Sequence, residues 1–213
     1  MIEYHKIETL FERDMDGTKK LIPGKYRNPL VELLKDVTWV ATEKIDGTNI
    51  RIYWDGHTVK VRGRTDAAQL HVDLVDYLKS KFCTPEAEQM FEQMFGEKEV
   101  YFFGEGYGAG IQKAGQHYIK DKRFIMFDVC INGFWQNKQT VDEIATAFGV
   151  PSVAVVAQGS LEELVEYVRS RPKSVHSEDK DFEMEGVVAQ PLIECRDQAG
   201  KRLVVKIKVC DFE

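Results

Sequence analysis

Three short runs of β-branched and aromatic residues between positions 39 and 62 constrain the fold most strongly. The runs at 49–54 and 58–62 are separated by little more than Asp55-Gly56, a strong hairpin signal between two strands. The run at 39–42 predicts a strand that leads toward this hairpin. Further apolar runs predict strands at residues 100–103, 124–129, 186–189 and 203–208. Because these strands show no regular βαβ alternation, they favour largely antiparallel sheets.

Helical spacing of apolar residues occurs between the predicted strands. It predicts helices over residues 70–82 and 86–95, which Thr84-Pro85 separates, and a third from Thr140 to Phe148. Ser160 and Glu163 form a capping-box pattern that opens a fourth helix. The charged stretch 171–181 predicts a mobile loop. The expected fold class is therefore α+β.

Length and composition bound the class of protein. The chain has 213 residues, of which 43% are hydrophobic and 30% charged, and we expect one domain over residues 1–213. No window approaches eighteen apolar residues and the N-terminus is charged, so we expect a soluble protein of the cytoplasm, or of a host cytoplasm if the source is viral. The four cysteines are widely spread without a C-x-x-C pair, which argues against structural zinc and disulfides.

The net charge of −6 excludes a broad basic face for nucleic acid. Any contact with a polynucleotide must then be local. Solvated surface is the competing interpretation for each basic group. The candidates are Lys19, Lys20, Lys25 and Arg27; Arg62 and Arg64; Lys113, Lys120, Lys122 and Arg123; and Lys201 and Arg202.

A lysine two residues before Asp-Gly is the main chemical feature of the chain. An unperturbed lysine costs roughly 4 to 5 kcal/mol to hold neutral at pH 7, so a nucleophilic lysine needs nearby cations, burial or a metal. Asp46-Gly47 suits a turn that exposes Lys44. A surface lysine beside a hairpin turn is the competing interpretation. The motif reads Glu43-Lys44-Ile45-Asp46-Gly47-Thr48-Asn49.

The late strands strengthen the chemical interpretation. Lys206 and Lys208 share one strand face by the period-2 rule, and like charges on an apolar strand are costly unless an anion meets them. An edge strand protected by lysines is the alternative. Glu105 and Glu185 adjoin predicted strands, where they could bind a ribose hydroxyl or hydrated Mg²⁺ or be exposed acids at turns.

These motifs, in this order, resemble those of the covalent nucleotidyltransferases, the superfamily of ATP-dependent ligases and capping enzymes, and specifically the phage RNA ligase 2 family. The resemblance extends from about residue 39 to the end. It rests on the Lys44 motif, Phe103-Gly104-Glu105-Gly106-Tyr107-Gly108-Ala109-Gly110-Ile111-Gln112, Phe127-Asp128, Glu185-Gly186-Val187-Val188 and Lys206-Ile207-Lys208. It implies an adenylyltransferase domain with flanking helices and a nucleotide cleft between its sheets.

The resemblance also implies a role for each motif residue. Lys44 becomes adenylylated, Glu105 holds the ribose, Phe127 stacks on adenine, and Asp128 and Glu185 bind hydrated Mg²⁺ or Mn²⁺. Lys206 and Lys208 orient the α-phosphate of ATP and aid loss of pyrophosphate. Asn49 positions metal-bound water, and Arg64 or its competitor Arg62 contacts ribose or a 5′-phosphate. The backbone of Glu43 and of the residue before it reads the adenine edge.

The implied activity is that of an ATP-dependent RNA ligase. AMP would pass from ATP to Lys44 and then to an RNA 5′-phosphate, and a 3′-hydroxyl would close the phosphodiester, in RNA such as a nicked duplex. The chain ends five residues after Lys208, without the C-terminal domain usual in this superfamily. An adenylyltransferase module that needs a protein partner for sealing is therefore an alternative, as are a DNA nick ligase, a capping-type guanylyltransferase and a noncatalytic nucleotide-binding protein.

Overall fold

The computed structural model describes residues 2–18 and 20–213 and divides them into two compact units. Unit 1 contains the described residues 2–4 and Asp46–Val153, and unit 2 contains His5–Ile45 and Ala154–Glu213. The chain passes between the units after Tyr4, Ile45 and Val153. The predicted α+β class is confirmed, because each unit combines a mostly antiparallel sheet with helices. Assignment of all 213 residues to one functional domain stays a prediction.

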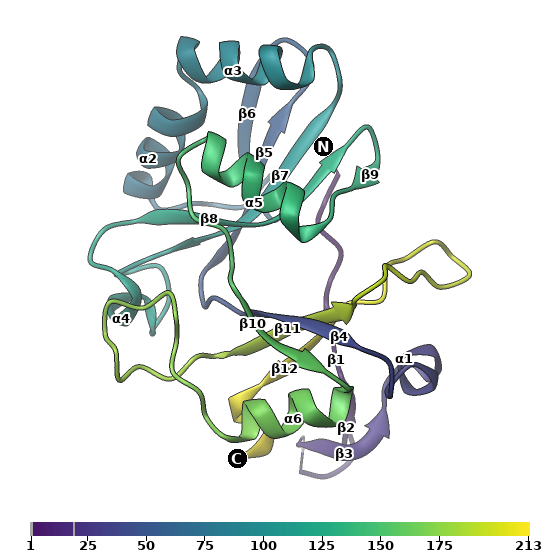
Figure 1. Ribbon diagram of the computed structural model, residues 1–213. Coiled ribbons are helices and arrows are strands. Elements are labelled where there is room, and N and C mark those ends of the chain that lie inside the picture. The colour runs from purple at the N-terminus through teal and green to yellow at the C-terminus, as the bar shows by residue number, and fades with distance from the viewer. Residues whose placement is uncertain (1, 19) are drawn as a thin grey trace. The chain divides into compact units, whose positions relative to one another are not determined.

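Unit 1 is built on a five-stranded antiparallel sheet in the order β6-β5-β7-β8-β9 (Figure 1). The predicted hairpin forms its first two strands, since Trp54 pairs with Val59 across the Asp55-Gly56 turn. A register shift interrupts the pairing of β7 with β8 next to Gly104. The strands are β5 (Thr48–Trp54), β6 (Val59–Gly63), β7 (Val100–Tyr107), β8 (Arg123–Ile131) and β9 (Phe134–Trp135).

Helices contribute to the apolar core on one face of this sheet. Leu78 and Phe82 of α2 (Val72–Phe82), Phe91 of α3 (Pro85–Phe95) and Ile144 of α5 (Lys138–Ala147) are buried there with Ile52 and its neighbours. The predicted start of the third helix at Thr140 is wrong by two residues. Asn137 caps the helix through Thr140 N, and an asparagine at the N-cap satisfies a backbone donor that would otherwise be unpaired. The short α4 (Gly115–Tyr118) follows β7.

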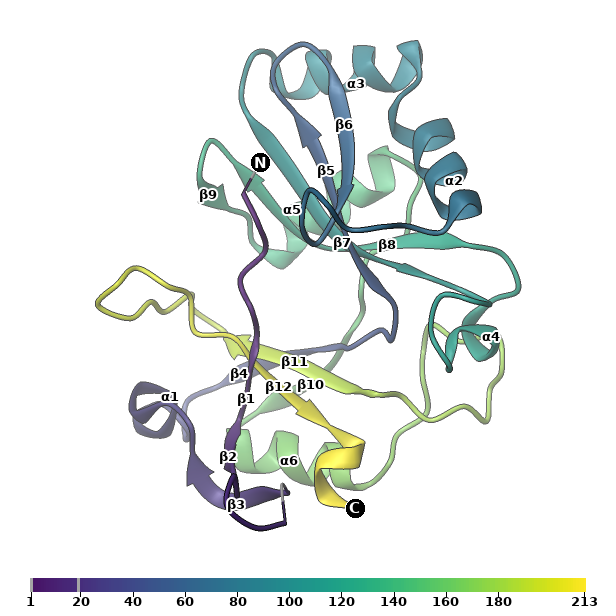
Figure 2. The ribbon, with the colours of Figure 1, turned by 180° about the vertical axis from the view of Figure 1, so that it is seen from behind.

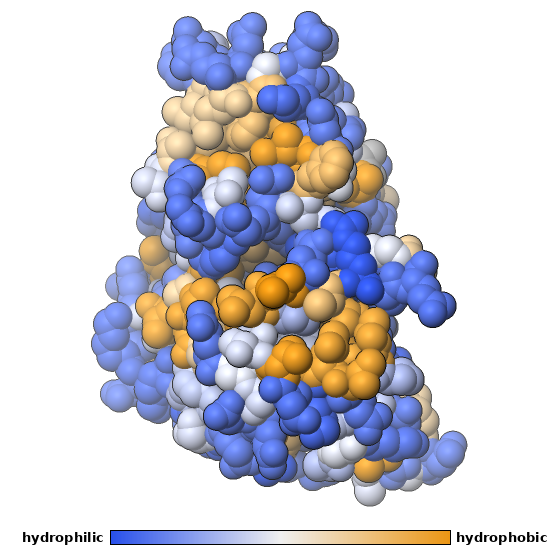
Figure 3. Space-filling model, turned by 45° about the vertical axis from the view of Figure 1, so that its right-hand side comes forward, coloured by the Kyte–Doolittle hydropathy of each residue, from blue (hydrophilic) through white to orange (hydrophobic). Residues whose placement is uncertain are grey.

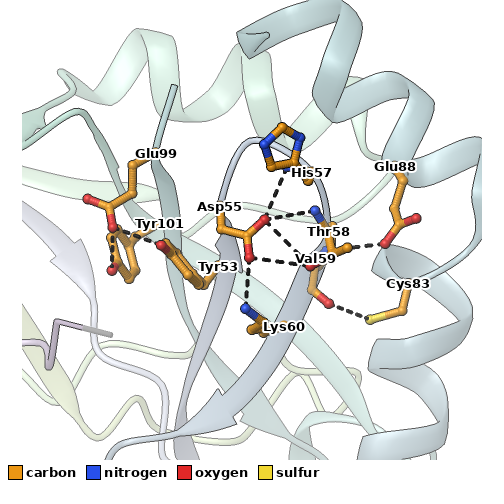
Figure 4. A network of polar contacts seen from close by, with 10 residues as sticks. All are labelled: Tyr53, Asp55, His57, Thr58, Val59, Lys60, Cys83, Glu88, Glu99 and Tyr101. Atoms are coloured by element: carbon orange, nitrogen blue, oxygen red, sulfur yellow. Dashed lines mark hydrogen bonds and ion pairs between the residues drawn. The ribbon is translucent and has the colours of Figure 1, made fainter. Parts of the chain in front are cut away.

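The opposite face of the sheet in unit 1 is aromatic and polar. Tyr53 stacks on Tyr101 with ring centroids 4.5 Å apart, and both hydroxyls donate to Glu99, as Figure 4 shows. The N-terminal segment binds here, because Ile2 N donates to Tyr101 and Ile2 O accepts from Arg51. Arg51 is completely buried, and it also donates to Gly63 O and to the Asp66 carboxylate.

Unit 2 is built on a sheet in the order β1-β12-β11-β4-β10. Only the pairing of β1 with β12 is parallel. A separate ribbon of two strands and a short helix come from residues before β4, a region for which the sequence suggested no elements. The elements are β1 (Glu8–Thr9), β2 (Phe11–Arg13), β3 (Leu21–Tyr26), α1 (Pro29–Leu33), β4 (Trp39–Glu43), β10 (Val155–Gly159), α6 (Leu161–Arg169), β11 (Gly186–Pro191), β12 (Val205–Lys208) and η1 (Val209–Phe212).

The core of unit 2 lies between its sheet and α6, and Figure 2 shows this helix against the strands from behind. Leu161, Leu164 and Val168 of α6 are buried with Trp39 and Val187. The predicted capping box is present, since Ser160 Oγ accepts from Glu163 N while the Glu163 carboxylate accepts from Ser160 N. Residues 171–181 form no helix or strand, but Ser174 and Val175 bind the Glu43 side chain and so anchor this segment.

Apolar side chains reach the surface in several groups, and Figure 3 shows such groups among hydrophilic ones. In unit 2, Leu192 and Ile193 follow β11 and are 61% and 79% exposed. They lie beyond the end of β11 that pairs with Trp39, whereas Gly186 at its other end accepts a hydrogen bond from Lys44 N. This apolar group is therefore at the strand ends away from Lys44. No helix within the described residues is long and apolar enough to cross a membrane.

Candidate active site

Lys44 directly follows β4 on the half-exposed face of that strand. Side chains alternate along a strand, so Trp39, Ala41 and Glu43 are buried while Val40 and Thr42 are half-buried. Lys44 continues this alternation, and its backbone N–H donates to Gly186 O at 3.0 Å. The lysine backbone is thus held by the strand that begins directly after Glu185.

Glu185 bridges two of the predicted lysines. Its Oε2 lies 2.6 Å from Lys44 Nζ, and its Oε1 lies 2.5 Å from Lys208 Nζ. All three side chains are largely but not completely buried, with exposures of 17% for Glu185, 24% for Lys44 and 28% for Lys208. Burial alone would lower the pKa of Lys208, but the hydrogen bond and charge of Glu185 outweigh it and raise that pKa.

Gly186 allows this bridge because its backbone lies against β12. A Cβ at this position would lie 2.2 Å from Ile207 O and 2.7 Å from Lys208 Cα, and its φ of +152° is rare for other residues. A side chain here would therefore push the strand that carries Lys208 away from Glu185.

Lys206 lies on the same sheet face as Lys208, as the period-2 rule predicted. It pairs with Val188, and Lys208 pairs with Gly186, while Val205 and Ile207 between them are buried. Partial burial and the charges of Lys44, Lys208 and Lys6 lower the pKa of Lys206. A half-buried cation crowded by like charges is a favourable place for an anion such as phosphate. Sequence reasoning did not single out Lys6.

Glu43 points to the opposite face from Lys44. Its carboxylate is 1% exposed and accepts from Ser174 Oγ and Val175 N, and its backbone N–H donates to Ala154 O. Burial raises its pKa, and these hydrogen bonds offset only part of that effect. The Glu43 side chain is thus used within unit 2, and its predicted adenine contact through the backbone stays a prediction.

Unit 1 places Asn49 and Glu105 directly opposite each other on β5 and β7. Cross-strand partners lie on the same face, about 4.5 to 5.5 Å apart at Cβ. Asn49 Oδ1 is buried and has no hydrogen-bond partner among the described residues, which marks a polar group available to a ligand. A Cβ at Gly47 would lie 2.8 Å from Glu105 Cγ and 2.3 Å from Gly106 O. Gly47 therefore lets the turn after Lys44 approach the strand that carries Glu105.

The register shift between β7 and β8 lets the neighbouring residues Phe127 and Asp128 take part in the same group of contacts. Phe103 pairs with Asp128 and Gly104 pairs with Met126, which leaves Phe127 as the extra residue of a β-bulge. Asp128 is 6% exposed, and its two oxygens accept from Tyr4 Oη and Val129 N. Phe127 is half-buried, with its ring centroid 5.0 Å from that of Tyr4. Sequence reasoning missed Tyr4, because no local pattern joins residue 4 to residue 128.

Arg62 and Arg64 are both exposed at the end of β6. Arg62 pairs with the buried Arg51 and donates to Val61 O. The choice between these two arginines for a ribose or phosphate contact stays a prediction.

The two carboxylates predicted to bind metal belong to different units. Glu185 belongs to unit 2 and Asp128 to unit 1, and the described residues contain no group of three or more side chains that could hold a metal ion. Hydrated Mg²⁺ is often held by one or two carboxylates together with substrate phosphates. The Glu185 carboxylate is partly exposed, but Lys44 and Lys208 occupy its two oxygens in this arrangement, so a metal ion there would have to displace at least one of these ion pairs.

Comparison with solved structures identifies the fold. RNA ligase structures from Naegleria gruberi match with TM-scores of 0.67 for a variant with ATP and Mn, 0.64 for a variant with AMP and Mn, and 0.63 for the protein with PPi. Their identities to the chain are 18%, 14% and 18%, and the matches cover 99%, 97% and 98% of it. They cover only 57%, 62% and 62% of those structures. No curated protein matches the chain.

The fold is thus that of these RNA ligase structures. The profile of the family described as RNA ligase matches residues 37–208, which include every predicted site residue. The chain belongs to the RNA ligase family. Membership of the phage RNA ligase 2 subfamily stays a prediction.

Proposed function

We propose that this protein is an ATP-dependent RNA ligase in which Lys44 carries AMP. The observation that carries the proposal is the Lys44–Glu185–Lys208 bridge with Lys206 on the same sheet face, in a chain of the RNA ligase family. Lys44 attacks the α-phosphate of ATP, and pyrophosphate leaves as the phosphoramidate bond forms. AMP then passes to an RNA 5′-phosphate, and a 3′-hydroxyl displaces AMP to form the phosphodiester.

The lysines of unit 2 are suited to phosphate chemistry. Lys206 and Lys208 extend from one face of β12, where two cations can offset the charge that develops on the phosphates. In the resting arrangement Glu185 holds the ammonium groups of Lys44 and Lys208. Attack on phosphorus requires Lys44 to leave this ion pair as a neutral amine. The supporting likeness is to Naegleria structures with ATP, AMP or PPi.

Residues of unit 1 are suited to recognition of the nucleoside. Phe127 offers a half-buried aromatic ring for adenine, and base–aromatic stacking contributes about 1 to 3 kcal/mol per base. Glu105 and Asn49 supply polar groups on one sheet face for the ribose hydroxyls and for water near the phosphate. Arg64, or Arg62, is proposed to contact ribose or the RNA 5′-phosphate.

A divalent ion, Mg²⁺ or Mn²⁺, would offset the negative charge of the pyrophosphate leaving group. Glu185 is the residue of unit 2 proposed to hold it. The Naegleria structures with ATP or AMP contain Mn, which supports this choice of cofactor. The proposed substrate is RNA with 5′-phosphate and 3′-hydroxyl ends, probed first as a nicked duplex, and a protein partner is proposed to assist sealing.

Covalent labelling tests the proposal. The protein is incubated with α-labelled ATP and Mg²⁺ or Mn²⁺, denatured and examined for retained label. We expect label on the wild type and on Lys35→Ala, a control in unit 2 whose ammonium pairs with the adjacent Asp36, and none on Lys44→Ala. An unlabelled wild-type protein, or equal labelling of Lys44→Ala, would refute the lysyl-AMP intermediate.

Two comparisons then separate the alternatives. Labelling by GTP in preference to ATP would indicate a guanylyltransferase. A chase of the labelled protein with nicked RNA-containing and all-DNA duplexes distinguishes an RNA ligase from a DNA ligase. Label that transfers to the 5′-phosphate without sealing would indicate an adenylyltransferase module that needs a partner.

A further inference from the structure

The N-terminal segment of unit 1 is bound to the sheet face that carries Glu105 and Asp128. Ile2 is held by Tyr101 and Arg51, and Tyr4, only 8% exposed, is held two residues later. Its hydroxyl donates to Asp128 Oδ2 at 2.7 Å. Specific hydrogen bonds thus fix this short segment at both Ile2 and Tyr4.

Tyr4 contacts both Phe127, the residue proposed to stack on adenine, and its neighbour Asp128. Its ring meets Phe127 edge-on at 76° with centroids 5.0 Å apart, while its hydroxyl binds Asp128. Successive residues of a regular strand point to opposite faces. The β-bulge at Phe127 removes that restriction, so one tyrosine can contact both residues. Its ring also lies 5.0 Å from Phe103 and 5.6 Å from Trp135.

The hydrogen bonds of Asp128 satisfy a carboxylate that is almost completely buried. Tyr4 Oη binds one oxygen and Val129 N binds the other. A buried carboxylate is costly without such donors, and hydrogen bonds to a charged acceptor are among the stronger ones.

We propose that Tyr4 is a positioning residue for nucleotide binding, whose hydroxyl fixes Asp128 and whose ring supports the side of Phe127. Phe127 then keeps one orientation, with a ring face available to adenine. Asp128 acts by holding Tyr4 and the bulge, and it is not a metal ligand. The inference rests on the proposed function, because it assigns Phe127 to the adenine of ATP.

The first test removes only the hydroxyl. In Tyr4→Phe, the ATP concentration that gives half-maximal labelling of Lys44 should rise about threefold to tenfold, because a hydrogen bond to a charged group is lost. The maximal labelling rate should stay within about twofold of the wild-type rate. At saturating ATP the bound nucleotide takes the same orientation as in the wild type. Tyr53→Phe is the matched control, because the Tyr53 hydroxyl also donates to a carboxylate on this sheet face, that of Glu99. It should behave as the wild type.

The second test separates positioning from metal binding at Asp128. In Asp128→Asn, the amide oxygen can accept from Val129 N while the amide nitrogen donates to the Tyr4 hydroxyl. We therefore expect half-maximal labelling within about twofold of the wild-type ATP and Mg²⁺ concentrations. Thermal unfolding of each variant fixes an assay temperature at which it is folded.

Two results would overturn the inference. One is a Tyr4→Phe variant with the same ATP dependence as Tyr53→Phe. The other is an Asp128→Asn variant whose labelling is restored only by raised Mg²⁺, as expected for a lost metal ligand. Both presuppose a labelled wild type, so absence of wild-type label would count against the proposed function and is distinguishable from either result.

Discussion

The two units present different chemistry on faces of similar construction. In unit 1, the sheet face opposite the helices carries stacked aromatic rings, the pair Asn49–Glu105 and a carboxylate bound by neutral donors. In unit 2, the half-exposed sheet face carries Lys44, Lys206 and Lys208 around one carboxylate. Planar surfaces and neutral donors suit a nucleoside, whereas clustered ammonium groups suit phosphates. A strand scaffold of one kind thus supports two kinds of recognition.

The nucleophile motif spans the boundary between these units. Lys44 is held in unit 2 by Gly186 O and Glu185. In unit 1, Asp46 N donates to Tyr118 Oη, and Gly47 O accepts from Gln112. Lys44 and the Asp46-Gly47 turn of the same short motif are thus anchored in different units. The stretch 103–112, which contains both Glu105 and Gln112, therefore supports the turn after the nucleophile as well as carrying Glu105.

The largest effect is expected from a substitution in unit 2, to which we assign the phosphate chemistry. Lys206→Ala should slow labelling of Lys44 at saturating ATP by about 10²-fold or more, because it removes a cation proposed to act on the transferring phosphate. The ATP concentration for half-maximal labelling should change much less. Single-turnover labelling over a range of ATP concentrations separates the two quantities.

Lys35→Ala is the matched control for Lys206→Ala, since Lys35 is an exposed lysine of the same unit paired to Asp36. It should label at the wild-type rate. If Lys206→Ala instead weakened ATP binding and kept the saturated rate, unit 2 would contribute to binding more than to chemistry. The division between the units would then fail.

A smaller effect is expected from a substitution in unit 1, to which we assign recognition of the nucleoside. Phe127→Ala should raise the ATP concentration for half-maximal labelling about tenfold, because loss of base stacking costs about 1 to 3 kcal/mol. The saturated rate should change less than in Lys206→Ala. Phe127→Tyr, which keeps an aromatic ring, should stay close to the wild type.

Phe134→Ala controls for the loss of an aromatic ring from the same sheet. Phe134 lies in β9 and is 73% exposed, so its removal should leave ATP dependence unchanged. Equal effects of Phe127→Ala and Phe134→Ala would show that general weakening of the sheet, and no specific stacking, causes the change.

Much of the fold could be predicted because its signals are local. The Asp55-Gly56 turn fixed the hairpin of β5 with β6, and alternation along β12 placed Lys206 and Lys208 on one face. The capping box at Ser160 also lies within four residues. The α5 start was misplaced because Asn137, a stronger cap, lies just before the expected boundary. Order and identity of the motifs supplied the candidate site residues.

The remaining features depend on contacts that are distant in sequence. Tyr4 meets Asp128 only because the N-terminal segment crosses the sheet face and β8 contains a bulge. Glu185 joins Lys44 to Lys208 only through the pairing of β4, β11 and β12. Strand alternation turns the Glu43 side chain to the core, where Ser174 and Val175, distant in sequence, bind its carboxylate. No local pattern specifies such partners.

The smallest expected effect is that of a substitution at Glu43. It tests the contrast between the two faces of β4, because the Glu43 and Lys44 side chains point to opposite faces. Burial raises the pKa of Glu43 in the folded state above its ordinary value of 4.5. Between those two pKa values the folded state binds more protons than the unfolded state, so the free energy of unfolding falls as pH rises through this window. Glu43→Gln removes this contribution, and the variant should gain stability relative to the wild type as pH rises above 4.5. The gain should be about 1 kcal/mol, the scale of one hydrogen bond.

Denaturant unfolding at several pH values measures this gain in stability, with a substitution of the exposed Glu162, Glu162→Gln, as the control. Because Glu43 faces away from Lys44, labelling should be affected less than stability. A Glu43→Gln variant with unchanged pH dependence but impaired labelling would instead place this carboxylate with the nucleotide.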